Sequence, residues 1–295
     1  MGYAMLLGAL KVFDRAEIVF SCATPEKKAA VYEKTGVRFV DSNAECANSA
    51  KYIVLAVKPQ VYDTVIKNIR NIITPDNIII SLAPGVSIEH LRDALGVPAR
   101  IVRAMPNTPA MLGAGMTGIS YNRAEFSREE IEVLNKFFNS FGMVAEVPEK
   151  LMGAVTCASG SSPAYVYMFI EALADSVVKL GIPRDKAYVM VAKTVEGAAK
   201  MVLETREHPA VLKDKVCSPG GTTICGVEAL EEYDDYKVLI CPDHATPLSL
   251  KTHTNDPIPF LMYHKKDEVE GMAEFTEETA KATGTFVDIG HELMQ

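Results

Sequence analysis

The sequence lacks several features that would place the protein in other classes. No apolar run in its 295 residues reaches the roughly 18 residues that a membrane-spanning helix needs. Its six cysteines contain no CxxC pair, which favours reduced, mostly buried thiols in a cytoplasmic protein. It also lacks a positive charge excess, and a net charge of −8 argues against nucleic acid as a partner. These absences indicate a globular protein without a membrane partner.

Charge is distributed unevenly along the chain. No arginine follows Arg206, and four of the six histidines lie after residue 233. Residues 233–295 carry 12 acidic and 5 basic side chains, so most of the net negative charge belongs to this last fifth of the sequence. The change in composition suggests two segments of different origin.

The first predicted domain, residues 1–148, alternates patterns of two kinds. Continuous apolar runs of strand length are separated by segments with helical spacing, which is typical of a parallel sheet covered on both faces. We therefore expect a doubly wound, Rossmann-type α/β domain that binds a dinucleotide at the carboxyl ends of its strands. The expected strands are residues 18–22, 52–57, 77–83 and 101–105, and the expected helices are residues 25–34, 60–69 and 88–95.

A glycine-rich phosphate loop usually opens such a domain, after a short first strand. This sequence instead begins in what reads as the first helix, with Gly2 in the place of the last glycine of the GxGxxG fingerprint. We interpret the domain as lacking its first strand and two of its glycines. The alternative is a domain that starts differently, with residues 1–10 as a surface helix.

Two further segments follow. Residues 149–232 are expected to form an all-helical domain, with one helix over residues 162–180 and another that starts at Pro183 and continues through Lys200. Both helices are apolar on more than one face, which is typical of a buried bundle core. Residues 233–295 contain strand-like pieces at 238–241 and 258–263 and a short helical pattern at 275–282, too little for a core of its own.

A glycine turn carries the clearest chemistry. Ser218 and Pro219 are followed by Gly220-Gly221 and by Thr222-Thr223 at the start of an apolar helical segment. Glycines allow a ligand to approach the backbone, and the N–H groups at a helix start favour an anion. The turn therefore suits a small carboxylate, although a capped helix start without a ligand has the same pattern.

Three loops are expected to meet at the carboxyl edge of the sheet. Ala56-Val57-Lys58-Pro59, Ala83 and Asn107 each follow a predicted strand, so together they form one crevice in which a nicotinamide could lie. A solvated lysine at position 58 and an Asx turn at Asn107 are the plainer alternatives.

The end of the first predicted strand bears on the choice of cofactor. It lacks the acidic residue that holds the ribose hydroxyl of NAD, and Ser21, Thr24 and nearby lysines follow instead. Hydroxyl groups and a helix start can accept a 2′-phosphate, which favours NADPH over NADH.

The glycine turn and the AVKP loop make residues 1–232 resemble the pyrroline-5-carboxylate reductases. The resemblance implies that the backbone of Gly220–Thr222 binds the substrate carboxylate, with Ser218 as a further substrate-binding residue. By the same resemblance Thr223, the catalytic candidate, hydrogen-bonds the ring nitrogen. It also implies a homodimer or higher homo-oligomer, built by helices of the second domain. Ala56–Pro59 would be a cofactor loop.

The last segment contains a possible metal pattern. Asp243, His244 and His253 have the donor types of a Zn²⁺ or Mn²⁺ site, although such a set is more often accidental. Residues 234–295 resemble the C-terminal part of the archaeal-type cofactor-independent phosphoglycerate mutases. In that resemblance these three residues are vestigial ligands, because nothing upstream supplies their partners, and no working metal site is expected.

The sequence thus predicts hydride transfer from NAD(P)H to 1-pyrroline-5-carboxylate, giving L-proline. Two alternatives remain open: a catalytically impaired reductase-like remnant or fusion product, and a metal-dependent phosphoglycerate mutase.

Overall fold

The computed structural model describes residues 1–231, 237–240 and 261–264. The chain divides into two compact units, the first formed by Met1–Pro163 and the second beginning at Ala164. The domain boundaries predicted after residues 148 and 232 stay predictions, and the first compact unit continues to Pro163.

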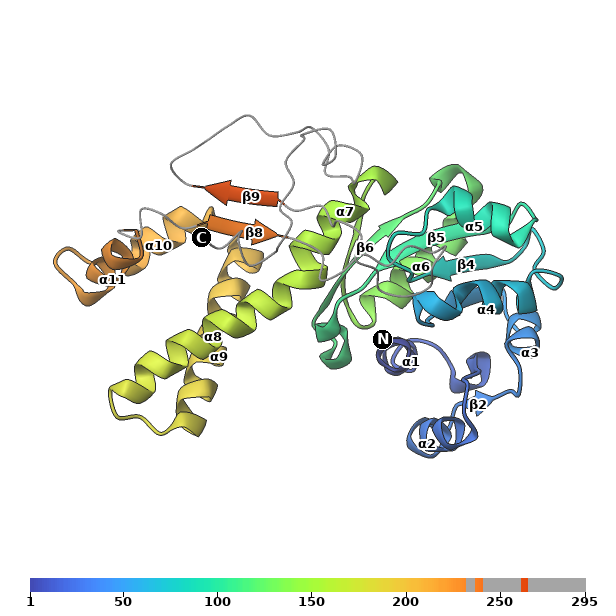
Figure 1. Cartoon of the computed structure of the whole chain (residues 1–295), viewed down its shortest axis with the longest axis horizontal. Helices are drawn as coiled ribbons and strands as arrows, with labels where there is room; N and C mark the ends of the chain where they lie inside the picture. Colours follow the sequence, from blue (N-terminus) through green and yellow to red (C-terminus); the bar gives the residue numbers. More distant parts are fainter. Residues whose placement is uncertain (232–236, 241–260, 265–295) are drawn as a thin grey trace, which may run out of the picture. The chain divides into compact units, whose positions relative to one another are not determined.

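A five-stranded sheet forms the centre of the first unit (Figure 1). Its strands are β3 (Tyr52–Leu55), β4 (Ile78–Ser81), β5 (Arg100–Met105), β6 (Gly115–Ser120) and β7 (Gly142–Glu146), which lie in this order. The first three are parallel, as predicted, with Ile53 beside Ile79 and Ile79 beside Ile101. The next strand, β6, is antiparallel to β5, and β7 is parallel to β6. A short connection cannot make a parallel crossover, which explains why β6 reverses direction after the loop that follows β5.

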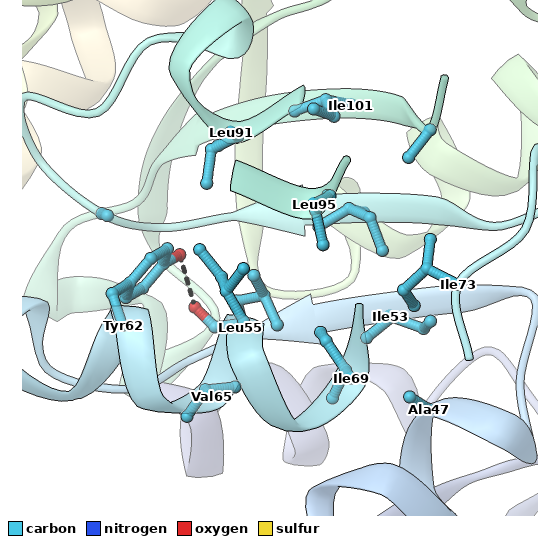
Figure 2. Close-up of a cluster of buried hydrophobic side chains, with 14 of the residues drawn as sticks. Ala47, Ile53, Leu55, Tyr62, Val65, Ile69, Ile73, Leu91, Leu95 and Ile101 are labelled. Atoms are coloured by element: carbon cyan, nitrogen blue, oxygen red, sulfur yellow. Dashed lines mark hydrogen bonds between the residues drawn. The ribbon is translucent and has the colours of Figure 1, made fainter. Parts of the chain in front are cut away.

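Apolar side chains of alternate strand residues cover both faces of this sheet. On one face Ile53, Ile79 and Ile101 pack against α4 (Tyr62–Ile69) and α5 (Ile88–Leu95) (Figure 2). On the other face Ile78 and Ile80 pack with residues of α1 (Gly2–Ala9) and α6 (Arg128–Asn139). The prediction of a sheet that is buried on both sides is confirmed.

A separate two-stranded parallel sheet joins β1 (Val19–Phe20) to β2 (Arg38–Phe39). The strand β1 is shorter than predicted, and β2 was not expected. Between them lies α2 (Pro25–Thr35), which begins at a proline in its first turn and ends at Gly36 in the left-handed conformation. The remaining helix of this region is α3 (Asn43–Asn48).

Long helices dominate the second unit. They are α8 (Ser162–Lys179), whose first two residues belong to the first unit, α9 (Arg184–Thr205), α10 (Pro209–Val216) and α11 (Thr222–Glu231). Pro183 is the N-cap of α9, one position before the place expected for it. The strands β8 (Lys237–Ile240) and β9 (Leu261–His264) pair antiparallel, close to the two strand-like pieces of the sequence. The helical pattern predicted at residues 275–282 lies outside the described residues.

The sequence also led to expectations about membrane-spanning helices and about the cysteine thiols. Among the described helices, none is both long and apolar enough to cross a membrane. The expectation of mostly buried thiols is wrong for the five described cysteines, because four are half-buried and Cys225 is exposed. All five are free, as expected.

Candidate functional site

The carboxyl ends of β3, β4 and β5 lie at one edge of the sheet, because the three strands are parallel. The structure therefore brings together the three predicted loops: residues 56–59, the segment around Ala83, and the segment around Asn107. This is the edge where open α/β sheets bind their ligands.

The first helix starts beside the loop after β3. A Cβ atom placed on Gly2 would lie 3.0 Å from the Cβ of Ala56, so the amino end of α1 and the end of β3 are neighbours. Ala56 and Lys58 are exposed, and Val57 packs against the core below. Pro59 begins the short 3-10 helix η2 (Pro59–Val61), for which Lys58 is the N-cap. The amino end of α1, which is the positive end of its dipole, thus lies near the loop that carries the exposed Lys58. This combination suits phosphate groups.

A buried hydrogen-bond chain fixes the ends of β3 and β4. The hydroxyl of Tyr62 donates to the carbonyl of Leu55 at 3.2 Å (Figure 2). The same hydroxyl lies 2.9 Å from Ser81 Oγ. Its single proton is used on Leu55, so Ser81 donates to Tyr62, and the Ala83 N–H lies 3.4 Å from Ser81 Oγ. Burial raises the pKa of Tyr62, which keeps this hydroxyl protonated and able to donate.

Ala83 itself is buried, backbone included, so the structure leaves little of this residue open to a ligand. The hydrogen bonds from Leu55 through Tyr62 and Ser81 hold the backbone of Ala83 near the end of β3.

Asn107 lies one residue beyond Pro106 and two beyond the end of β5. Its side chain makes no local cap for the short helix η3 (Thr108–Leu112), so the amide does not form the Asx turn that was the plainer alternative. Instead Oδ1 accepts from the Met116 N–H at 2.9 Å, and Nδ2 donates to the Ser159 carbonyl at 3.0 Å. Met116 and Ser159 were not anticipated from the sequence, because they lie 9 and 52 positions away.

The residues expected to recognise a 2′-phosphate surround the end of β1. Ser21 Oγ donates to Asn43 Oδ1 at 2.7 Å, and Thr24 is the N-cap of α2 without using its hydroxyl as a cap. Of the nearby lysines, Lys28 already pairs with Asp41 at 3.1 Å, while Lys27 is exposed. Thr24 and Lys27 are therefore better placed than Lys28 to meet an added anion.

The glycine turn belongs to the second unit. Gly220 has a φ of +67°, which favours glycine, and the Gly221 N–H donates to the Ser218 carbonyl at 3.0 Å. The helix α11 then starts at Thr222, as the sequence predicted. Because the first N–H groups of a helix have no partner within the helix, those of Thr222 and Thr223 can bind an anion. Both threonines are exposed.

The predicted metal ligands Asp243, His244 and His253 lie outside the described residues. Within the described part of the chain, no group of three histidine, cysteine or acidic side chains could hold a metal ion.

Comparisons with known proteins match both of these regions of the chain. Residues 149–240 match the family model for pyrroline-5-carboxylate reductase dimerisation, and residues 1–85 match a model described as NADP oxidoreductase, coenzyme F420-dependent. A pyrroline-5-carboxylate reductase of Escherichia coli is 46% identical over 209 residues, which cover 71% of this chain and 77% of that protein. This chain belongs to the pyrroline-5-carboxylate reductase family.

Further members of the family give the same result. The reductase of Methanosarcina acetivorans is 41% identical and aligns with 79% of this chain and 86% of its own length. Among solved structures, the reductase of Coxiella burnetii superposes with a TM-score of 0.73 at 33% identity, covering 78% of this chain and 86% of that one. The reductase of Plasmodium falciparum, solved with NADP bound, has a TM-score of 0.67 at 32% identity, over 79% of this chain and 86% of that one.

The end of the chain matches a different model. Residues 227–295 match the Metalloenzyme superfamily, which supports the resemblance to a mutase fragment in this segment. The change in charge after residue 233 therefore coincides with a change of family.

Proposed function

We propose that this protein is a pyrroline-5-carboxylate reductase, which transfers a hydride from NADPH to C5 of 1-pyrroline-5-carboxylate and releases L-proline. The observation that carries the proposal is that one matched region contains predicted cofactor-binding residues and the other contains the predicted substrate-binding turn. Residues 1–85 include Gly2, the loop after β3 and Ala83, and residues 149–240 include the glycine turn.

NADPH supplies the hydride when it is bound, and NADH is the alternative donor. The chain has a suitable cradle for the dinucleotide in the start of α1 at Gly2 and the exposed Ala56 and Lys58, with the buried Ala83 at the same edge of the sheet. Ser21 and Thr24 would lie near the 2′-phosphate. The cradle is supported by the shared edge of β3, β4 and β5, and the assignment of Ser21 and Thr24 by their place after β1.

The substrate carboxylate would bind at the start of α11, to the backbone from Gly220 to Thr222, with Ser218 shaping the turn. Thr223 would hold the ring nitrogen through its hydroxyl. A protonated imine is itself electrophilic, so the chain has only to position it, and positioning can supply a large part of the rate enhancement.

The dimerisation model matched by residues 149–240 supports a homo-oligomer, and we propose a homodimer as its minimal form. Tyr167, Met168 and Val189 leave large apolar surfaces exposed on α8 and α9 of a single chain, as a helical interface requires. The cytoplasm is the proposed location, with neither nucleic acid nor membrane as a partner.

The test is oxidation of NADPH by the purified full-length protein with 1-pyrroline-5-carboxylate, together with detection of L-proline. The E. coli reductase serves as the positive control. A rate equal to that without enzyme rejects the reductase activity. Saturable NADPH binding without turnover would instead identify the catalytically impaired alternative.

A second candidate, a metal-dependent phosphoglycerate mutase, is favoured only by the Metalloenzyme superfamily match of residues 227–295. It ranks below the reductase because this segment is short and lacks upstream metal partners. Mutase activity of the same preparation with added Mn²⁺ would reverse that ranking.

A further inference from the structure

Asn107 differs from the other predicted cofactor residues in how its side chain is engaged. Asparagine is a favoured N-cap, because its short side chain bonds the backbone of the next turn. Asn107 occupies the N-cap position of η3 and makes no such bond. The amide is 8% exposed and is directed instead to two distant backbone groups.

Its two partners belong to different elements. Met116 is the second residue of β6, and Ser159 lies in η6 (Thr156–Ser161), a segment of π-helix. One amide therefore joins the loop after β5, the start of β6 and η6. Ser159 is itself buried, so the bond gives a hydrogen-bond partner to a backbone carbonyl that water reaches poorly.

The π-helix leads directly into α8. Its wide turn is stabilised by the Ser159 hydroxyl, which donates to the Val155 carbonyl at 3.0 Å, and by the Ser162 hydroxyl, which donates to the Cys157 carbonyl at 2.5 Å. Short π-helical turns are uncommon and often occur at functional sites. The bond from Asn107 fixes this turn against the edge of the sheet where the cofactor loops meet.

We propose that Asn107 is a positioning residue, which acts through the backbone of η6 and β6 rather than by binding the cofactor with its side chain. This proposal rests on the proposed reductase activity. Its amide sets the separation between the loop after β5 and η6. Misplacement of reacting groups by about 1 Å can cost about a hundredfold in rate, so the expected effect falls on kcat.

Asn107→Asp tests this directly, because it preserves shape and the acceptor for Met116 but loses the donor to Ser159. We expect kcat to fall at least about tenfold while the Kd for NADPH, measured by fluorescence titration, changes by less than about threefold. Asn107→Ser provides a second variant that introduces no charge. It should show the same fall in kcat with little change in the NADPH Kd.

Asn77 is a matched control. Its Oδ1 accepts from the Thr74 N–H at 2.8 Å and its Nδ2 donates to the Ala50 carbonyl at 3.1 Å, but it lies at the opposite, amino edge of β4. Asn77→Asp is expected to lower stability without changing kcat.

Two results would overturn the proposal. A rise in the NADPH Kd of about tenfold or more with unchanged kcat would identify a direct cofactor contact, and equal effects of the Asn77 and Asn107 variants on kcat would identify a purely structural role. Hydrogen exchange gives an arm that is independent of turnover: in Asn107→Asp it should rise in residues 156–161, while Met116 keeps its acceptor. Unchanged exchange in residues 156–161 would reject the positioning role even if the wild-type protein proves inactive.

Discussion

The two units bury apolar surface to very different extents. The first encloses large side chains on both faces of a sheet, including Tyr62 and Phe138. The second buries only Ala174, Ala187 and Val191 among its described residues, and leaves Met168 at 68% and Val189 at 70% exposed. Because burial of apolar area is the main favourable term in folding, the first unit holds a complete core, and the second requires another surface. A second copy of the chain is the partner that the dimerisation family indicates.

The largest expected effect is a loss of self-association through the exposed apolar helices of the second unit. Met168→Glu places a charge on the exposed apolar face of α8 and should weaken self-association by about a hundredfold or more, since a buried unpaired charge costs several kcal/mol. Sedimentation should change from dimer to monomer. Met143→Glu is the matched control, because Met143 is 51% exposed on β7 of the first unit and its replacement should leave the mass unchanged. A dimeric Met168→Glu protein would contradict the assignment of this face.

The next effect tests a charge network of the first unit. Glu130 accepts hydrogen bonds from Arg100 at 2.7 Å and pairs with Lys51 at 2.7 Å, with its side chain only 8% exposed. Glu130→Gln leaves the Arg100 guanidinium without its counter-charge and should lower the free energy of unfolding by about 3 kcal/mol, measured by urea denaturation. Glu132→Gln, which breaks the exposed pair with Arg128, should cost less than about 0.5 kcal/mol. Equal losses of unfolding free energy in the two variants would show that the network around Glu130 stabilises the protein no more than the exposed pair does.

The same carboxylate gives the first unit a pH dependence. Burial alone would raise the pKa of Glu130, but hydrogen bonds from Lys51, the Ser127 backbone and Arg100 outweigh it and lower the pKa from 4.5 to about 2. A lowered pKa means that this contribution is present above pH 4.5 and is lost as the pH falls toward 2. It amounts to roughly 3 kcal/mol, and Glu130→Gln should lack it. Identical acid-unfolding curves for the two proteins would argue against this shift.

Two glycines provide a test, with a smaller expected effect, of the difference between the packed first unit and the exposed second unit. A Cβ on Gly118 of β6 would lie 2.5 Å from Val155 Cγ1, whereas one on Gly226 of α11 would meet nothing within 4 Å of the single chain. Gly118→Ala should therefore lower the melting temperature through overpacking of about 1–3 kcal/mol. A second change, Val155→Ala, should restore part of the loss. A single Gly118→Ala variant as stable as wild type would show that the contact can relax.

At Gly226, alanine should add about 0.5–1 kcal/mol of helix stability in the monomeric Met168→Glu background. A loss of stability there would mean that the surface around Gly226 is already packed within one chain.

Local patterns in the sequence predicted much of the fold. The helix predicted at residues 88–95 has these ends in the structure, where Ser87 caps it and Gly96 follows it in the left-handed conformation. The strands β3, β4 and β5 were recognisable because each is a continuous apolar run. The helix α6 was overlooked although its capping box, formed by Ser127 and Glu130, gave a clear signal.

Other features could not be predicted from local patterns. The direction of β6 depends on the length of the loop before it, and β2 has only two residues, Arg38 and Phe39. The sequence placed Asn107 at the correct edge, but not its bond to Ser159, because a contact across 52 positions is a property of the folded chain. The roles of Ser218–Thr223 in binding the substrate carboxylate stay predictions.

The dependence of activity on the dimer is measured by the rate of L-proline formation and the NADPH Kd, determined for wild-type protein and for monomeric Met168→Glu. Wild type should turn over, and the monomer should bind NADPH with a similar Kd, since the first unit has its own core. The monomer should lose at least about tenfold in rate, because the helical unit lacks its partner surface. A monomer with the full rate, or a wild-type rate no higher than that without enzyme, would contradict this dependence.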